Sequence, residues 1–359
     1  MQTPGTPDIA ILADDLTSAS DGAGPFVARG MRAMIGRGRL PDQSSSVVAV
    51  DSQSRSLSSG QAANLSADLT ARLADRRILY KTVDSTLRGH VTVEIAASFH
   101  ASGRKTLVFA PAFPGAGRTT IGGVQFVDGI RVSESRYGSD PVHPARVCVL
   151  ADLVPSSVAN AVILDATTQE ELDAAVMAIP APETILWVGS PGMAIALARS
   201  VASGAEAVSM PTVESEAKHD EILVVIGSAN PRSHTQADRI AGVRGVTILR
   251  NPIARTPDPH ALLRTIAADA AQRICAQPVD LLIATGGDTM EAILDLLEIR
   301  SFEIVLELEP GFPLGRAITA NGRVLHLAMK AGGFGNDDTL QCAIVALQRT
   351  TPQKREATP

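Results

Sequence analysis

Two cations, one carboxylate and three hydroxyls gather in the segment KTVDSTLRG, residues 81–89, directly after the apolar run ILY. Carboxylate and hydroxyl groups can bind the hydroxyls of a ligand, and a cation can pair with an acid. A small polyhydroxy acid needs both kinds of contact. We therefore predict substrate-binding side chains at Lys81, Asp84, Ser85 and Arg88. The alternative is that Lys81 is an ordinary surface amine and that Asp84 and Ser85 cap the helix predicted to follow.

A pair of adjacent acids, Asp14 and Asp15, ends another apolar run, IAILA. In one interpretation these carboxylates only cap the next helix, whose dipole favours negative charge at its start. In the other, they bind substrate hydroxyls, and one of them accepts the proton of the reacting hydroxyl as a catalytic base. Adjacent side chains leave a strand in opposite directions, so we expect one acid to cap and the other to act. Asp15 is the first candidate for the base and Asp14 the second.

Two further segments carry an arginine beside hydroxyl residues. In DSQSR, residues 51–55, Arg55 is either a solvated surface side chain or, if it faces the same site, a two-point clamp for a carboxylate. In PAFPGAGRTTIGGVQFVDG, residues 111–129, the prolines and glycines predict a long rigid loop. There Arg118 and the two threonines after it serve either phosphate binding or packing.

Three glycine-containing loops lie in the C-terminal half: IGSANPRSHTQ at 226–236, ATGGDTMEAI at 284–293 and MKAGGFGNDDTL at 329–340. The first two lie between a predicted strand and a predicted helix. Small residues let backbone amides approach phosphates, and a helix N-terminus favours negative charge. None of the three is a Walker A or dinucleotide fingerprint. Three such loops in one half of the chain nevertheless predict a nucleotide site.

Apolar runs alternate with longer Ala-rich segments of helical spacing along the chain, which predicts mostly parallel β-sheets covered by helices. We therefore predict an α/β fold of two domains with a cleft between them, because polar clusters repeatedly follow the runs and parallel strands present ligand-binding groups at their carboxyl ends. A polar linker at 203–220 separates a predicted substrate domain, 1–210, from a predicted nucleotide domain, 211–359. Predicted strands are at 8–15, 45–55, 77–84, 105–113, 160–166, 184–190, 221–228, 280–287 and 303–309. Predicted helices are at 60–76, 91–103, 192–202, 233–243 and 288–297.

Composition narrows the functional classes. The formal net charge of the 359 residues is -6, which argues against a non-specific nucleic-acid binder. No window approaches the ~20 apolar residues of a membrane helix, and no signal peptide is visible. The three cysteines, Cys148, Cys275 and Cys342, lie far apart, so we predict buried free thiols in the cytoplasm instead of disulfides or a zinc site. The histidines lack metal-ligand spacing, and the sequence leaves any metal ligands unknown.

Taken in order, ADDLT, DSQSR, KTVDSTLRG, PAFPGAGRTT, YGSDP, the Gly-Ser loop, GGD and KAGGFG resemble the motifs of the four-carbon acid sugar kinase family. The resemblance extends over nearly the whole chain, and KTVDSTLRG and PAFPGAGRTT are its most specific parts. The sequence departs from the family pattern at Ser18, where glycine is usual, and at Asp288, where glutamate is usual.

This resemblance implies that the N-terminal domain binds a sugar acid such as threonate, erythronate or an oxo-tetronate, and that the C-terminal domain binds ATP. It also implies transfer of the terminal phosphoryl group to the hydroxyl at carbon four, with Mg²⁺ bridging the phosphates. The matching substrate positions, to which we add Arg88, are Asp14 or Asp15, Arg55, Lys81, Asp84 and Ser85. The matching ATP positions, to which we add Asp288 and Thr289, are Ser228, Gly286, Gly287, Gly332 and Gly333.

The expected mechanism is direct phosphoryl transfer between domains that close over the cleft, which depends on positioning and on neutralising phosphate charge. Arg55 and Lys81 are expected to hold the carboxylate of the acid, and Asp84 and Ser85 its hydroxyls. Two alternatives stay open: a non-catalytic sugar-acid-binding protein, and an oxidoreductase for a small hydroxy acid, which should show a dinucleotide fingerprint. The sequence leaves open the stereoisomer, a reduced or oxo substrate, and a homodimer, which is common among compact cytosolic enzymes.

Overall fold

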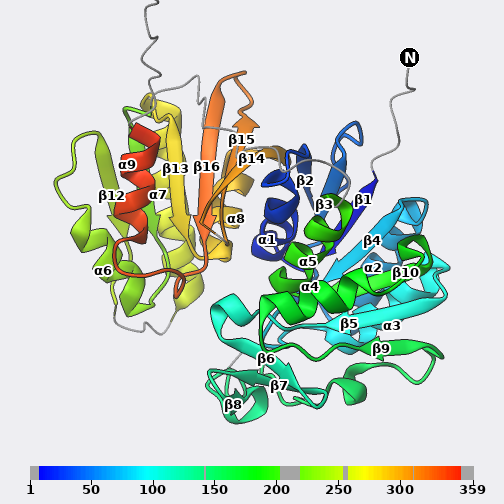
Figure 1. Ribbon diagram of the computed structural model, residues 1–359. Helices are drawn as coiled ribbons and strands as arrows, with labels where there is room; N and C mark the ends of the chain where they lie inside the picture. Colours follow the sequence, from blue (N-terminus) through cyan, green and yellow to red (C-terminus); the bar gives the residue numbers. More distant parts are fainter. Residues whose placement is uncertain (1–7, 141–142, 203–218, 254–257, 310, 349–359) are drawn as a thin grey trace, which may run out of the picture. The chain divides into compact units, whose positions relative to one another are not determined.

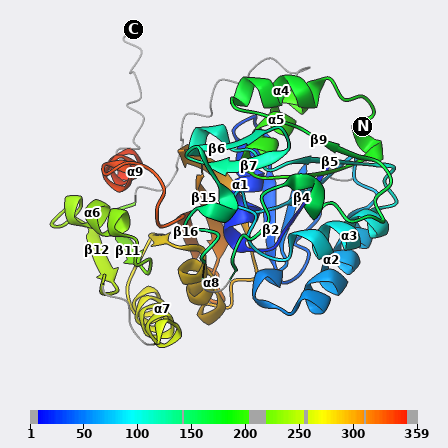
Figure 2. The same cartoon turned by 90° about the horizontal axis from the view of Figure 1, so that it is seen from below.

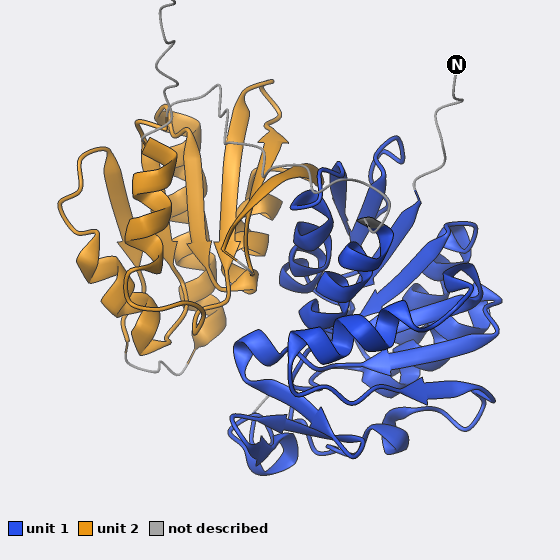
Figure 3. Cartoon of the chain, viewed as in Figure 1, with its two compact units in different colours: residues 1–207 blue, residues 208–359 orange. Residues whose placement is uncertain are grey.

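A computed structural model describes residues 8–140, 143–202, 219–253, 258–309 and 311–348. The chain divides into unit 1, residues 1–207, and unit 2, residues 208–359, which Figure 3 shows in blue and orange. Each unit has its own run of strands and its own core, so each is described by itself. The predicted linker at 203–220 lies outside the described residues, apart from its last two positions.

Unit 1 is built on a parallel sheet with the strand order β2-β3-β1-β4-β10-β5-β9. All of its strand pairs are parallel, so the carboxyl ends of the strands lie at one edge. The strands are β1 (Ile9–Ala13), β2 (Ala33–Arg37), β3 (Val47–Asp51), β4 (Ile78–Thr82), β5 (Thr106–Ala110), β9 (Ala161–Ile163) and β10 (Ile185–Gly189).

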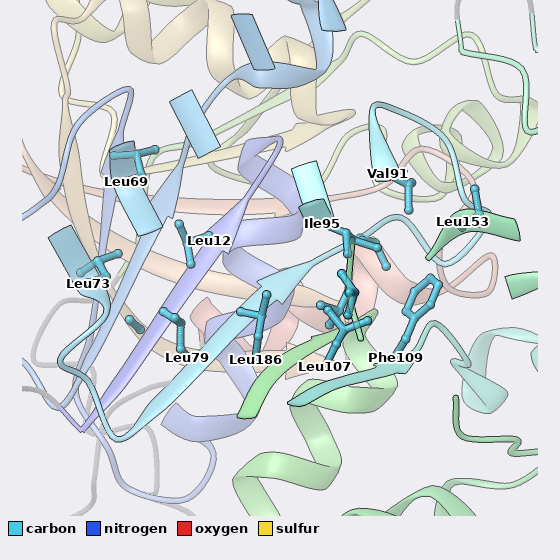
Figure 4. Packing of buried hydrophobic residues seen from close by; sticks show 14 of the residues in the cluster. Leu12, Leu69, Leu73, Leu79, Val91, Ile95, Leu107, Phe109, Leu153 and Leu186 are labelled. Atoms are coloured by element: carbon cyan, nitrogen blue, oxygen red, sulfur yellow. The ribbon is translucent and has the colours of Figure 1, made fainter. Parts of the chain in front are cut away.

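Helices cover both faces of this sheet (Figures 1 and 2). The helices α2 and α3 pack together on one face, and α1, α4 and α5 lie on the other. Figure 4 shows the core beneath α2 and α3, where Leu12 and Leu186 of the sheet meet Leu69 and Ile95 of the helices. The helices of unit 1 are α1 (Leu16–Val27), α2 (Ser59–Leu73), α3 (Val91–Ser102), α4 (Gln169–Met177) and α5 (Pro191–Ala202). The residues of β1, β3 and β4 are buried on both faces of the sheet, as expected for parallel strands that are covered by helices on both sides.

A second, small antiparallel sheet in unit 1 contradicts one prediction, because residues 111–129 do not form a long loop throughout. They contain β6 (Arg118–Ile121) and β7 (Val124–Val127), to which β8 (Ile130–Arg131) is added. Gly122 and Gly123 have φ angles of 58° and 71°, which a two-residue hairpin turn requires. The sequence reading counted these glycines as loop residues, although a Gly-Gly pair is a hairpin signal.

Unit 2 has a mixed sheet in the order β12-β11-β13-β16-β15-β14, parallel as far as β16 and antiparallel beyond it. Its strands are β11 (Ile222–Ile226), β12 (Val246–Arg250), β13 (Leu281–Thr285), β14 (Ser301–Glu309), β15 (Phe312–Ile318) and β16 (Val324–Lys330). Its helices are α6 (Pro231–Arg239), α7 (Pro259–Ala276), α8 (Gly287–Leu296) and α9 (Thr339–Gln348). In Figure 2, α6 and α9 flank the sheet on one side, and α7 and α8 on the other. The predicted α/β class with mostly parallel sheets is confirmed.

Short 3₁₀ turns connect several elements of unit 1: Ser54–Ser56, Pro114–Ala116, Val132–Glu134, Leu150–Leu153 and Pro182–Thr184. Within the described residues, no helix is long and apolar enough to cross a membrane. The three cysteines are free thiols as predicted, but the prediction that all are buried is wrong. Cys148 is buried, whereas Cys275 and Cys342 are exposed because they lie on the outer sides of α7 and α9.

Candidate functional site

The carboxyl ends of β1 and β3 bring Asp14, Asp15 and Arg55 into direct contact. Arg55 lies in the short turn after β3 and binds Asp14 at two points, with Nε to Oδ2 at 2.7 Å and Nη2 to Oδ1 at 3.0 Å. Its Nη1 also forms an ion pair with Asp15. The side chain of Asp14 is 5% exposed and that of Asp15 is 23% exposed, so Asp15 is the more accessible acid. Three residues predicted separately therefore form one charged group.

The expectation that the two acids point apart is wrong, because both contact the same guanidinium. Asp15 also caps α1, since its Oδ1 accepts the Ser18 amide at 2.7 Å. Capping and contact with Arg55 are thus compatible, because the chain turns from strand to helix between the two residues.

Opposite pKa shifts distinguish the two acids. Burial pushes the pKa of Asp14 upward, but Arg55 and Lys81 outweigh this and hold it below its usual range. Burial raises the pKa of Asp15, and the neighbouring Asp14 carboxylate adds to the rise against the opposing effect of Arg55. A more accessible carboxyl with a raised pKa is the better proton acceptor of the pair.

The loop after β4 adds Asp84 and Arg88 to this group. Asp84 Oδ1 accepts the Thr86 amide at 2.9 Å, and Asp84 Oδ2 accepts Arg88 Nε at 2.5 Å. Burial opposes ionisation of Asp84, but Arg88 and Arg55 outweigh it, so its pKa is lowered. The alternative that Asp84 and Ser85 cap the next helix is wrong, since His90 is the N-cap of α3. We call Asp14, Asp15, Arg55, Asp84 and Arg88 the acid–arginine cluster.

A glycine allows this loop to close on the cluster. Gly89 has a φ of +92°, and a Cβ there would lie 3.1 Å from Asp14 Oδ2. Next to it, a cavity of about 270 Å³ is lined by Gly89, His90 and Arg146, among others. Ser85 is half-buried in the same loop. The cavity adjoins the cluster through Gly89, and none of the five cluster residues lines it.

Lys81 lies deeper than the sequence reading expected. It is 2% exposed, its Nζ lies 2.8 Å from Glu94 Oε2, and it donates to the Thr82 carbonyl at 2.9 Å. Glu94 Oε1 in turn accepts the Ser54 hydroxyl at 2.5 Å. Sequence reasoning missed Glu94, although a glutamate on the apolar stripe of α3 with Val91 and Ile95 was a usable signal. Lys81 is therefore no surface amine, and its contact with a substrate stays a prediction.

In unit 2, the three glycine loops converge at the carboxyl ends of β11, β13 and β16. A Cβ on Gly332 would lie 2.0 Å from Ser228 Oγ, and a Cβ on Gly227 would lie 1.9 Å from Thr289 Oγ1. A Cβ on Gly286 would lie 3.5 Å from Thr289 Oγ1. Only glycine permits this packing, which brings backbone rather than side chains to the surface of the site. The predicted residues Ser228, Gly286, Thr289 and Gly332 are thus neighbours.

The N-termini of α8 and α6 add backbone amides and a capping side chain to the glycine loops of unit 2. Gly287 and Asp288 form the first turn of α8, where amides have no intrahelical acceptor, and Asp288 is exposed. Asn230 caps α6 by accepting the Arg232 amide at 3.0 Å, and Pro231 takes the first helical position. Gly333 lies beside Asn230. This arrangement of small residues and free amides suits phosphate groups.

Lys330, at the end of β16, belongs to the same region and was not singled out from the sequence. It is 1% exposed, and its Nζ donates to the carbonyls of Ala331 and Phe334, both at 3.2 Å. Burial lowers its pKa to about 8, with a further contribution from Arg232. The signal was available, since a lysine two residues before the Gly332-Gly333 pair places a cation near this loop.

Unit 1 thus carries charged side chains at the carboxyl ends of its parallel strands, and unit 2 carries glycine loops at the carboxyl ends of β11, β13 and β16. Residues 9–162 match the sugar-binding N-terminal domain, and residues 213–340 match the nucleotide-binding C-terminal domain. The chain belongs to the four-carbon acid sugar kinase family.

Among curated relatives, a D-threonate kinase of Bordetella bronchiseptica is 30% identical, with 96% of this chain and 98% of the relative covered. A D-threonate kinase of Cupriavidus necator is 31% identical, with 92% and 95% covered. A 3-oxo-tetronate kinase of Burkholderia multivorans is 25% identical, with 95% and 97% covered.

Solved structures share the fold. A Salmonella typhimurium LT2 protein has a TM-score of 0.75 at 20% identity, covering 95% of this chain and 98% of its own. A Bordetella bronchiseptica protein of unknown function, a domain-swapped dimer with bound citrate, has a TM-score of 0.51 at 28% identity, with 96% and 99% covered.

Proposed function

We propose that this protein is an ATP-dependent kinase that phosphorylates the 4-hydroxyl of a four-carbon sugar acid. The observation that carries the proposal is full-length similarity to D-threonate kinases, at 30% and 31% identity. The 3-oxo-tetronate kinase is less similar, at 25%, so D-threonate is the first substrate to test. Threonate, erythronate and the 2-oxo and 3-oxo tetronates complete the candidate set.

In this proposal the N-terminal domain, residues 1–210, binds the acid and the C-terminal domain, residues 211–359, binds ATP. The acid–arginine cluster supports the first assignment because carboxylates accept hydrogen bonds from hydroxyls. Asp15 is the proposed base, since it is the more accessible acid and has a raised pKa. Asp14 then holds Arg55 in place through their two-point contact.

The glycine loops support the second assignment. Amides of Gly287 and Asp288 would bind phosphate oxygens, with Ser228 and Thr289 as hydroxyl donors. Gly332 and Gly333 leave room for the nucleotide. Lys330 would supply positive charge, because its pKa of about 8 leaves it mostly protonated near neutral pH.

Magnesium fits this arrangement only as a companion of ATP. Within the described residues, no group of three or more His, Cys, Asp or Glu could hold a metal ion. Mg²⁺ in kinase sites typically keeps several waters and binds substrate phosphates plus one or two carboxylates. When bound, it would neutralise phosphate charge. We propose a homodimer on the precedent of the domain-swapped Bordetella bronchiseptica structure, and a cytoplasmic location stays a prediction from the sequence.

The test is ADP release coupled to a panel of tetronates, with D-threonate first. We expect ADP release that depends on the acid, with product phosphorylated at carbon four by NMR. A protein that binds the acids without consuming ATP would be a binding protein. Turnover that depends on a nicotinamide cofactor would favour an oxidoreductase. Either result would remove the kinase proposal.

A further inference from the structure

The carboxylate of the proposed substrate needs a cation that is not already neutralised. Arg55 is engaged by both Asp14 and Asp15, and its pKa is raised well above its usual range because these acids and Asp84 outweigh its burial. Lys81 is buried against Glu94. The two side chains first expected to hold the carboxylate are therefore occupied by the protein's own acids.

A second group of cations lies around Tyr137. The guanidinium carbons of Arg88, Arg118 and Arg136 lie 5.4, 6.0 and 4.9 Å from the centre of the Tyr137 ring. Arg88 is paired with Asp84 at 2.5 Å and lies 3.6 Å from Asp140. By contrast, neither Arg118 nor Arg136 forms an ion pair with any carboxylate in the described part of the chain. Two uncompensated positive charges thus adjoin the acid–arginine cluster.

The Tyr137 hydroxyl accepts hydrogen bonds from these two arginines, and its own proton is not used in either bond. Its Oη accepts Nη2 of Arg118 at 3.1 Å and Nη2 of Arg136 at 2.9 Å. With both lone pairs used, the phenolic proton can still be donated to a ligand oxygen. The Nε of Arg118 is buried and has no partner among the described residues. Guanidinium and phenol donors of this kind suit a carboxylate, which accepts up to four hydrogen bonds.

The small sheet positions this group beside the loop that carries Asp84. Arg118 and Thr120 share one face of β6, because they are two residues apart on a strand. Thr120 Oγ1 donates to Gln125 Oε1 at 2.6 Å, and Gln125 Nε2 donates to the Ser85 carbonyl at 2.9 Å. Gln125 is fully buried, so this link between the hairpin and the loop is shielded from water. The hairpin therefore carries Arg118 toward the cluster.

We propose that Arg118, Arg136 and Tyr137 bind the carboxylate of the sugar acid and so select acids over neutral sugars. This assignment rests on the proposed kinase function and deepens it. The acids of the acid–arginine cluster then face the hydroxyls at the other end of the substrate, which separates the group that recognises the carboxylate from the group that acts on the hydroxyl.

The test compares the variants Arg118→Gln, Arg136→Gln and Tyr137→Phe with wild type in the full chain. For Arg118→Gln we expect the KM for D-threonate to rise about 10- to 100-fold, as for loss of a hydrogen bond to a charged group, with the KM for ATP unchanged. Arg136→Gln and Tyr137→Phe should give smaller rises. Arg131→Gln is the matched control, because Arg131 is exposed on β8 of the same small sheet.

A neutral four-carbon polyol, used as a second substrate, distinguishes a loss of carboxylate binding from a nonspecific loss of enzyme activity. Its weak turnover should be equal in wild type and Arg118→Gln, since it has no carboxylate to lose. Arg136 is exposed, so Arg136→Gln gives a folded second variant if Arg118→Gln does not fold. An unchanged KM for D-threonate in both overturns the assignment, and so does a raised KM for ATP alone, which would indicate a phosphate site. A wild type inactive on every tetronate overturns the proposed function instead, and the assignment with it.

Discussion

The candidate sites of the two units use different chemical groups: charged side chains in unit 1 and backbone amides in unit 2. In unit 1, ionised side chains at the ends of β1, β3 and β4 contact one another directly, as Asp14 and Asp15 do with Arg55. In unit 2, three glycine loops pack so closely that a Cβ on Gly332 would overlap Ser228. The first site offers charges, and the second offers backbone amides.

This difference fits what each proposed ligand requires. A sugar acid presents hydroxyls and one carboxylate, which are recognised by acceptors and cations at fixed places. A triphosphate presents many equivalent oxygens, which free amides at helix N-termini can bind without selecting one. Substitutions in unit 1 should therefore alter the turnover rate and the selectivity for the sugar acid. Substitutions in unit 2 should instead alter the affinity for the nucleotide.

The largest expected effect separates chemistry from binding. Asp15→Asn keeps a residue that caps helices well, so α1 should persist, but it removes the proposed base. We expect turnover to fall by roughly 10²- to 10⁴-fold, with ATP affinity nearly unchanged. The measurements are steady-state kinetics and titration with a non-hydrolysable ATP analogue. Turnover equal to wild type would remove Asp15 from this role.

The next effect concerns the buried pair beneath the acid–arginine cluster. Glu94→Gln removes the carboxylate that contacts the buried Lys81 ammonium and should lower the free energy of unfolding by about 3 kcal/mol. Urea unfolding measures this. The control is the double variant Lys81→Met with Glu94→Leu, which removes both charges and should recover most of the stability. If Glu94→Gln is as stable as wild type, the pair is not buried as described.

A smaller effect should appear in unit 2 alone. Gly332→Ala forces the loop away from Ser228, because the new Cβ would lie 2.0 Å from its Oγ. We expect the KM for ATP to rise by about tenfold, in line with overpacking costs, while D-threonate binding without nucleotide is unchanged. Gly60→Ala is the control, since nothing lies within 4 Å of its Cβ. Weaker acid binding with normal ATP affinity would contradict the division of roles.

The smallest effect is a pH dependence confined to the nucleotide site. The pKa of Lys330 is lowered to about 8, so the ammonium is present below that pH and lost as the pH rises through it. The KM for ATP should therefore rise a few-fold above pH 8, while the KM for the acid stays level because arginines keep their charge. Lys330→Arg should flatten the ATP profile. An acid KM that rises over the same range would count against this explanation.

Sequence pattern predicted much of the framework. The nine predicted strands and five predicted helices correspond to elements of the structure. The glycine loops after β11 and β13 were also found in the predicted layout. Elements with weak periodicity were missed, including the short strand β2 and the antiparallel β15. The hairpin β6–β7 lies where the prolines and glycines predict a loop, because the Gly122-Gly123 pair is the turn of a hairpin.

The ion-pair partners of the site residues were harder to predict than the strand ends at which these residues lie. The sequence placed Arg55, Asp14 and Asp84 near one edge of a sheet, but it did not show that Arg55 pairs with Asp14, which lies 41 positions away. The ion pair between Lys81 and Glu94 could not be predicted from the sequence, because it depends on how α3 packs on β4. Tyr137 and Arg136 lay outside the predicted site, since only tertiary packing brings Tyr137 to Arg88 and Arg136 to the same ring.

The sequence alone determined the two α/β halves, the strand ends and the glycine loops, because periodicity and turn chemistry are local properties of the chain. Only the tertiary structure decided which cations remain free for a ligand. That depends on the acids that folding brings within a few ångströms of each guanidinium or ammonium, and it is why we propose Arg118 and Arg136, instead of Arg55 and Lys81, as the carboxylate site.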